Sequence, residues 1–192
     1  MQTIHSNIYY LILLITPVRL MLWLWLKTVF RYVRAWTRDD KLMLNDVKTE
    51  FLIIGTERQL SMVSVDKIKI GQAEVSPVSS VRNLGTWFNS HLDMLTHVTK
   101  ACASTFYYLY NIRHIRKYLS RESTKRLAHA FITSRLDYCN GLLYGAPEYQ
   151  FKKLQRVMNA SAWLVYRALH WLPELHWLPV CLGVDFKILL VA

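Results

Sequence analysis

The chain has 192 residues, and its 24 Lys and Arg against 13 Asp and Glu give a formal net charge of +11 on a background that is 53% hydrophobic. So much apolar surface excludes a disordered tail, and the length allows one domain or slightly more. A basic excess on a folded chain indicates a polyanionic partner, either nucleic acid or the anionic face of a membrane. The cysteines, Cys102, Cys139 and Cys181, are far apart in the sequence, which favours a reducing, intracellular compartment over a disulfide scaffold or a zinc site.

An apolar segment near the start of the chain, residues 8–30, is followed by basic residues from Arg31 onward. This arrangement is typical of a transmembrane helix whose C-terminal flank lies in the cytoplasm. Pro17 and Arg19 argue against membrane insertion, because a central Arg costs about 2.5–3.5 kcal/mol. Two interpretations of residues 1–35 therefore stay open: a membrane anchor, or an additional apolar helix that is read through from flanking sequence and has no membrane role.

From residue 36 onward the pattern changes to that of a folded α+β chain. Three runs rich in β-branched residues, 51–55, 65–71 and 81–88, predict a small antiparallel sheet. Residues 72–80, which contain Ser-Pro and Ser-Ser pairs, predict a loop. We assign residues 36–90 to this sheet.

Beyond His91 the apolar residues recur every three or four positions, which is typical of amphipathic helices. The first predicted helix has about 25 residues and a stripe that we expect to be buried: Leu95, Val98, Cys102, Phe106, Leu109 and Ile112. Ser120 is a favourable N-cap for a second helix, whose inward residues are Leu127, Phe131 and Leu136. A third helix begins near Glu148, with the stripe Phe151, Leu154, Met158, Ala162 and Val165. We expect residues 91–192 to form a helical bundle.

Most of the positive charge lies between residues 100 and 170. Several basic residues there stand beside tyrosines or at the start of a helix: Arg113, Arg116, Lys117, Lys125 and Arg126. Such side chains can contact successive phosphates of one strand, and the tyrosines can stack on bases or riboses. The alternative is that these residues form an ordinary solvated face of the bundle.

Catalytic and metal-binding patterns are not evident in the sequence. The adjacent acidic pair Asp39 and Asp40 lacks the apolar strand that leads into a two-metal polymerase site. The seven histidines form no metal-binding pair, and there is no glycine-rich phosphate loop. We therefore expect no catalytic residue, no metal site and no small-molecule substrate.

Four motifs, in chain order, resemble the reverse transcriptases of LINE-type non-LTR retrotransposons, the jockey-like group. Residues 42–50, LMLNDVKTE, are similar to the family's stretch after the catalytic aspartates, and residues 81–88, VRNLGTWF, are similar to its primer-grip strand. Residues 134–140, SRLDYCN, and 154–160, LQRVMNA, match its thumb signatures. Residues 175–188, which begin LHWLPV and end DFKI, are similar to the segment beyond the thumb.

The resemblance implies a C-terminal fragment of an RNA-directed DNA polymerase, made of the palm edge and the thumb. It implies that Lys48 lies near the phosphates of the incoming nucleotide, and that Leu84 and Gly85 form the turn that holds the primer end. The helices after His91 would be the thumb, which clasps the template–primer duplex. Its basic residues would be Arg113, Arg116, Lys117, Lys125 and Arg126.

The same resemblance also shows what this chain does not match. The family carries an earlier catalytic aspartate, then a catalytic F/Y-A-D-D hairpin, and uses magnesium, but residues 1–31 resemble neither, and the fingers and most of the palm have no counterpart in this sequence. We therefore expect the chain alone to be inactive as a polymerase, with no cofactor of its own. The alternative functions are a single-pass membrane protein with a basic cytoplasmic domain, contacting the membrane through residues 8–30, and a general nucleic-acid-binding module.

Overall fold

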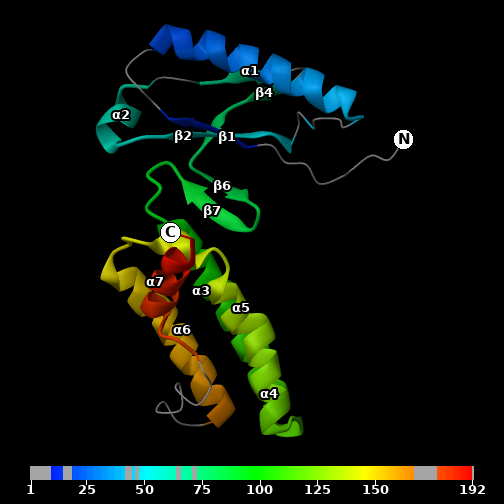
Figure 1. The fold of residues 1–192 in the computed structure, drawn as a ribbon, viewed down its shortest axis with the longest axis vertical. Coiled ribbons are helices and arrows are strands. Elements are labelled where there is room, and N and C mark those ends of the chain that lie inside the picture. Colours follow the sequence, from blue (N-terminus) through cyan, green and yellow to red (C-terminus); the bar gives the residue numbers. More distant parts are fainter. Residues whose placement is uncertain are drawn as a thin grey trace. The chain divides into compact units, whose positions relative to one another are not determined.

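The computed structural model describes residues 10–14, 19–41, 45, 48–63, 66–70, 73–166 and 177–191. The chain divides into two compact units, Met1–Leu92 (unit 1) and Asp93–Ala192 (unit 2) (Figure 1). The described strands all belong to unit 1, and unit 2 is helical where it is described. The fold is therefore of mixed α and β type, mostly helical with small sheets.

A parallel sheet lies at the centre of unit 1. Strands β1 (Tyr10–Leu14), β2 (Glu50–Ile54) and β5 (Pro77–Val78) pair in the order β1-β2-β5, and both ladders run parallel. The prediction of an antiparallel sheet is wrong for these strands, because the chain passes through helix α1 (Arg19–Asp39) between β1 and β2. Such a crossover returns the chain in the same direction, which a short hairpin cannot do.

Two antiparallel hairpins complete the described strands of unit 1. One joins β3 (Ile68–Ile70) to β4 (Ala73–Val75), and the other joins β6 (Ser80–Asn83) to β7 (Thr86–Asn89). The prediction of a loop over residues 72–80 is wrong, because β4 and β5 lie within it. The single strand predicted over residues 81–88 is a hairpin, because the chain reverses at Leu84 and Gly85.

Strand β2 builds a core on both faces of the sheet because its side chains alternate. Phe51 and Ile53 are buried on one face, and Leu52 and Ile54 are buried on the other. Residues from α1, from helix α2 (Glu57–Ser61) and from the first hairpin pack on the first face: Phe30, Leu60, Val63, Ile68 and Val75. The second face is covered by Val78, Val81 and Phe88.

The N-terminal region is a strand followed by a helix. The helix predicted over residues 8–30 is wrong for Tyr10–Leu14, which form β1, and the observed helix runs from Arg19 to Asp39. Pro17 explains from the sequence why one helix does not cover residues 8–30, since a proline disfavours a helix that continues through it. Of the helices that the structure describes, none combines the length and the apolar character needed to cross a bilayer.

Unit 2 contains a set of packed helices. Their bounds are α3 (Leu95–Ile115), η2 (Arg116–Tyr118), α4 (Arg121–Ala128), η3 (His129–Thr133), α5 (Ser134–Asp137), η4 (Asn140–Leu143), α6 (Glu148–Tyr166) and α7 (Val180–Val191). The predicted helix starts after Ser120 and at Glu148 are confirmed. The Ser120 hydroxyl accepts a hydrogen bond from the Ser123 amide at 3.0 Å, as an N-cap does.

The predicted apolar stripes are confirmed on α6, except that Phe151 is only half-buried, and in part elsewhere. Leu154, Met158, Ala162 and Val165 of α6 are buried, as are Val98 and Ile112 of α3 and Leu136 of α5. Phe106 is wrong as a core residue, because its side chain is half exposed while the neighbouring Thr105 is fully buried. Phe131 is also wrong; it lies in the π-helical turn η3, whose wider turn shifts the phase of the helix.

Candidate nucleic-acid interface

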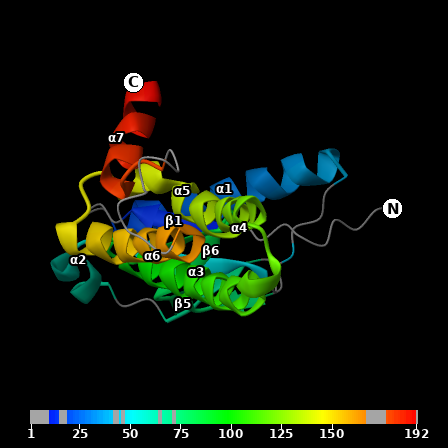
Figure 2. The ribbon, with the colours of Figure 1, turned by 90° about the horizontal axis from the view of Figure 1, so that it is seen from below.

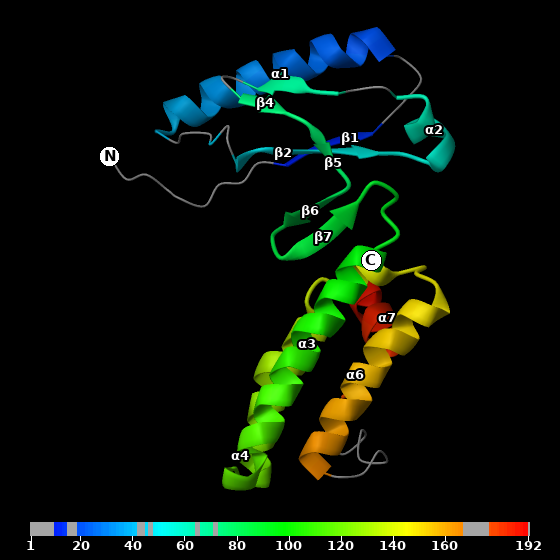
Figure 3. The ribbon, with the colours of Figure 1, turned by 180° about the vertical axis from the view of Figure 1, so that it is seen from behind.

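Helices α3 and α6 lie side by side and run in the same direction (Figures 2 and 3). At their N-terminal ends, the Gln150 side-chain amide of α6 donates to the carbonyl of Asp93, just before α3, at 2.8 Å. At their C-terminal ends, the Arg116 guanidinium donates to the carbonyl of Leu164 at 3.2 Å. These two contacts fix the register of the helices along their whole length.

Each of the two helices carries a row of solvent-exposed side chains. On α3 and the residues that follow it, exposed side chains recur at spacings of four, three and four, which places them on one side of the helix. A matching row runs along α6. Together they form what we call the α3–α6 face: Phe106, Tyr110, Arg113, Lys117, Tyr149, Lys153, Arg156 and Trp163.

One electrostatic contact links Cys102 of α3 to Lys153 in the row on α6. Cys102 is half-buried on α3, one turn before Phe106. Burial raises the pKa of its thiol, and the positive charge of Lys153 on α6 partly opposes that rise. Lys153 therefore lies on the side of α6 that is nearest to α3.

The α3–α6 face is positively charged because its helices are almost free of carboxylates. The sequence has no acidic residue from Leu95 to Arg121, and none from Tyr149 to Tyr166. Glu148, at the start of α6, is ion-paired with Lys152 at 3.0 Å. Arg113, Lys153 and Arg156 therefore lie on helices of which α3 carries no acidic residue and α6 carries one, which is already paired.

Aromatic rings alternate with these cations. The exposed fractions are 62% for Tyr110, 50% for Phe106, and 48% for both Tyr149 and Trp163. The ring of His114 lies against the ring of Tyr110, with 4.1 Å between the centroids. The face therefore offers both a positive potential and flat apolar surfaces to a partner.

Arg116, one of the predicted binding residues, has a structural task. Its guanidinium is half-buried and donates to the carbonyls of Leu119, Leu164 and Val165. Leu164 and Val165 belong to the last turn of α6, whose carbonyls have no partner within the helix. Arg116 thus caps α6, as a cation at a helix C-terminus does. Its neighbour Lys117 is exposed and lies 4.8 Å from the centroid of the Tyr118 ring.

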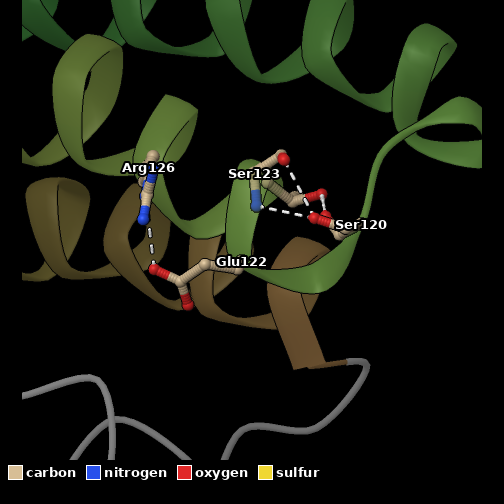
Figure 4. A network of polar contacts seen from close by, with 5 residues as sticks. Ser120, Glu122, Ser123 and Arg126 are labelled. Carbon is tan, nitrogen blue, oxygen red and sulfur yellow. Dashed lines mark hydrogen bonds and ion pairs between the residues drawn. The ribbon is translucent and has the colours of Figure 1, made fainter.

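Lys125 and Arg126 lie on α4 rather than on α3 or α6. The start of α4 is held by a network in which the hydroxyls of Ser120 and Ser123 lie 2.9 Å apart (Figure 4). In the same network Arg126 pairs with Glu122 at 3.4 Å, and Lys125 is half-buried. These two residues are therefore less available to an anionic partner than Arg113 or Lys153.

The predicted site residues of unit 1 lie in two turns. Lys48 is exposed, and its amide donates to the Asn45 side chain at 3.2 Å in the turn that leads into β2. Leu84 and Gly85 form the two-residue turn between β6 and β7, with φ angles of 47° and 88°. The predicted residues therefore fall into one group in unit 1 and another in unit 2.

Residues of the thumb signatures and of the last motif make hydrogen bonds inside unit 2. Asn140 donates to the side chain of Asp137 at 3.3 Å, and Lys187 on α7 donates to the Asp137 carbonyl. Gln155 accepts a hydrogen bond from the Val180 amide, at the start of α7, at 2.9 Å. The polar residues of these motifs therefore join α5, α6 and α7. Residues 175 and 176 of the last motif lie outside the described part.

Sequence reasoning missed the contribution of α6 to the face. Tyr149, Lys153 and Arg156 recur at spacings of four and three, and that pattern could have been read from the sequence as an exposed row. The structure was needed to show that this row lies beside the one on α3.

No group of three His, Cys, Asp or Glu side chains is placed to hold a metal ion within the part of the chain that the structure describes. Asp39 is the last residue of α1, and Asp40 follows in a turn. Comparison with models of known protein families, with curated proteins and with solved structures found no match to this chain.

Proposed function

We propose that the helical unit of this chain binds nucleic acid through the α3–α6 face. The observation that carries the proposal is the gathering of Arg113, Lys117, Lys153 and Arg156 on two adjoining helices that are nearly free of carboxylates. Such a row of cations releases the counterions condensed on a phosphate backbone, and this release supplies most of the affinity for nucleic acid.

The dimensions of the face suit a polyanionic strand. From Phe106 to Lys117 the row on α3 and η2 extends over eleven residues, which is about 16 Å along a helix axis. The second row, on α6, runs parallel to it. Cations on both sides of one line of contact can reach successive phosphates of a strand lying along that line, and such contacts position a strand without reading its sequence.

We further propose that the chain is the palm-edge and thumb part of a LINE-type, jockey-like reverse transcriptase that lacks the catalytic aspartates. The order of the four sequence motifs supports this proposal. A second support is that residues of two of these motifs, Asp137 and Gln155 in the thumb signatures and Lys187 in the last motif, make contacts that join helices of unit 2.

The binding function is tested with a variant that removes three charges from the face, Arg113→Gln, Lys153→Gln and Arg156→Gln. Its control removes three exposed charges from unit 1, Arg31→Gln, Arg38→Gln and Arg58→Gln. Both variants have the same net charge. Affinity for a labelled oligonucleotide is measured by fluorescence anisotropy at fixed salt.

We expect the face variant to lose roughly tenfold or more in affinity, while the control loses less than about threefold. Equal losses in the two variants would mean that the net charge of the chain, and not the α3–α6 face, governs binding. A wild-type chain that fails to bind any oligonucleotide would refute the proposed function altogether.

A further inference from the structure

Exposed aromatic rings accompany the cations along the α3–α6 face. Phe106 and Tyr110 are one helical turn apart on α3, about 6 Å along its axis, and Tyr149 and Trp163 lie on α6. Single exposed apolar side chains are common on protein surfaces and need no explanation. Here, four rings that are about half exposed or more lie on the same two adjoining helices as the cations Arg113, Lys153 and Arg156.

The charge of this surface limits what can cover it. A partner protein that buried the rings through apolar contacts would also have to remove water from Arg113, Lys153 and Arg156, which is costly without anionic groups to pair with them. A partner that carries flat apolar rings and regularly spaced negative charges satisfies both requirements. A nucleic acid strand has this combination.

The form of nucleic acid follows from the accessibility of its bases. In a duplex the faces of the bases are stacked on one another, so exposed protein rings gain contacts only at its ends. In an unpaired strand every base has a free face, and stacking on an aromatic side chain contributes substantially to affinity for any base.

We infer that the α3–α6 face binds unpaired nucleotides in preference to duplex, with bases stacked on Tyr110, Phe106 and Trp163 and phosphates held by the neighbouring cations. This inference rests on the proposed nucleic-acid binding by the α3–α6 face, and not on the resemblance to a thumb, which implies a duplex as the ligand; it adds the class of ligand to that binding function. The ring of His114 supports Tyr110 from one side, which keeps the tyrosine ring oriented before a base arrives.

The test compares an unstructured pyrimidine strand of about 12 nucleotides, as RNA and as DNA, with a hairpin duplex of equal phosphate number. The ring variant is Tyr110→Ala with Trp163→Ala, one ring from each helix. Its matched control is Tyr144→Ala with Trp36→Ala, which removes rings that are 67% and 63% exposed outside the face. A rescue variant, Tyr110→Phe with Trp163→Phe, keeps both aromatic faces. Circular dichroism checks that each variant stays folded.

We expect the wild-type chain to bind the unpaired strand about tenfold or more tightly than the duplex, in RNA, DNA or both. The ring variant should lose about fivefold or more per ring for the unpaired strand, with duplex affinity within about twofold, while the control and the rescue variant bind like wild type. Equal affinity for strand and duplex, or equal losses for both, would overturn this inference. If this inference fails, the variant Arg113→Gln, Lys153→Gln and Arg156→Gln still tests the proposed function, because the loss of three charges weakens binding of both the unpaired strand and the duplex.

Discussion

Leu84 occupies a backbone conformation that suits it poorly. Its φ of 47°, followed by a φ of 88° at Gly85, corresponds to a two-residue hairpin turn with two positive φ angles, in which Asn-Gly is the favoured pair. A leucine in this region costs roughly 1–2 kcal/mol, because its Cβ approaches the following carbonyl. Its side chain is 84% exposed, so burial gives little compensation.

We therefore predict that Leu84→Asn raises the free energy of unfolding by about 1 kcal/mol, and that Gly85→Ala lowers it by a similar amount. Urea unfolding followed by circular dichroism measures both. A destabilised Leu84→Asn variant would show that the leucine side chain makes contacts that outweigh the backbone strain.

Arg116 has a structural role, in contrast to the exposed cations of the α3–α6 face. Because its guanidinium caps α6 through the carbonyls of Leu164 and Val165, Arg116→Lys should lower the free energy of unfolding by about 1–2 kcal/mol, since a lysine keeps the charge and loses the planar fork. Lys117→Gln, next to it and exposed, should change stability by less than about 0.5 kcal/mol. Urea unfolding measures the stability of both variants, and equal changes in the free energy of unfolding would contradict the capping role of Arg116.

At the scale of elements, a side chain of α6 binds the first amide of α7. Gln155 accepts a hydrogen bond from the Val180 amide and donates to Asn159 at 2.9 Å. We predict that Gln155→Ala lowers the free energy of unfolding by about 1 kcal/mol and increases hydrogen exchange at the first amides of α7. Arg156→Gln, at the next and exposed position of α6, is the control. Unchanged exchange in α7 after Gln155→Ala would contradict the role of this contact.

The elements that could be predicted from the sequence are those whose signals are local. Helix α6 was predictable, because Glu148 follows a Gly-Ala-Pro break and the apolar residues keep a helical spacing. The pairing of β2 with β1 was not, because strand direction depends on where the chain returns after α1, which no local pattern records. The exposure of Phe131 depends on a π-helical turn, which a regular helical period does not anticipate.

At the scale of the whole molecule, the positive charge and the apolar content belong to different features. The rows of cations lie on α3 and α6 of unit 2, while β2 of unit 1 is buried on both faces of its sheet. The basic residues of α3 could be predicted as a candidate site from their spacing. The different roles of Arg116 and Arg113 could not be predicted, because both are arginines on consecutive turns and only the packing of α6 distinguishes them.

The central claim, that the α3–α6 face binds a phosphate backbone, is tested most directly by the salt dependence of binding. For an unpaired strand, the slope of log K against log salt changes by roughly 0.7 for each phosphate that the protein neutralises. We predict that Arg113→Gln, Lys153→Gln and Arg156→Gln together make this slope shallower by about 2, and that the matched charge variant of unit 1 leaves it unchanged. An unchanged slope in the face variant would contradict the account.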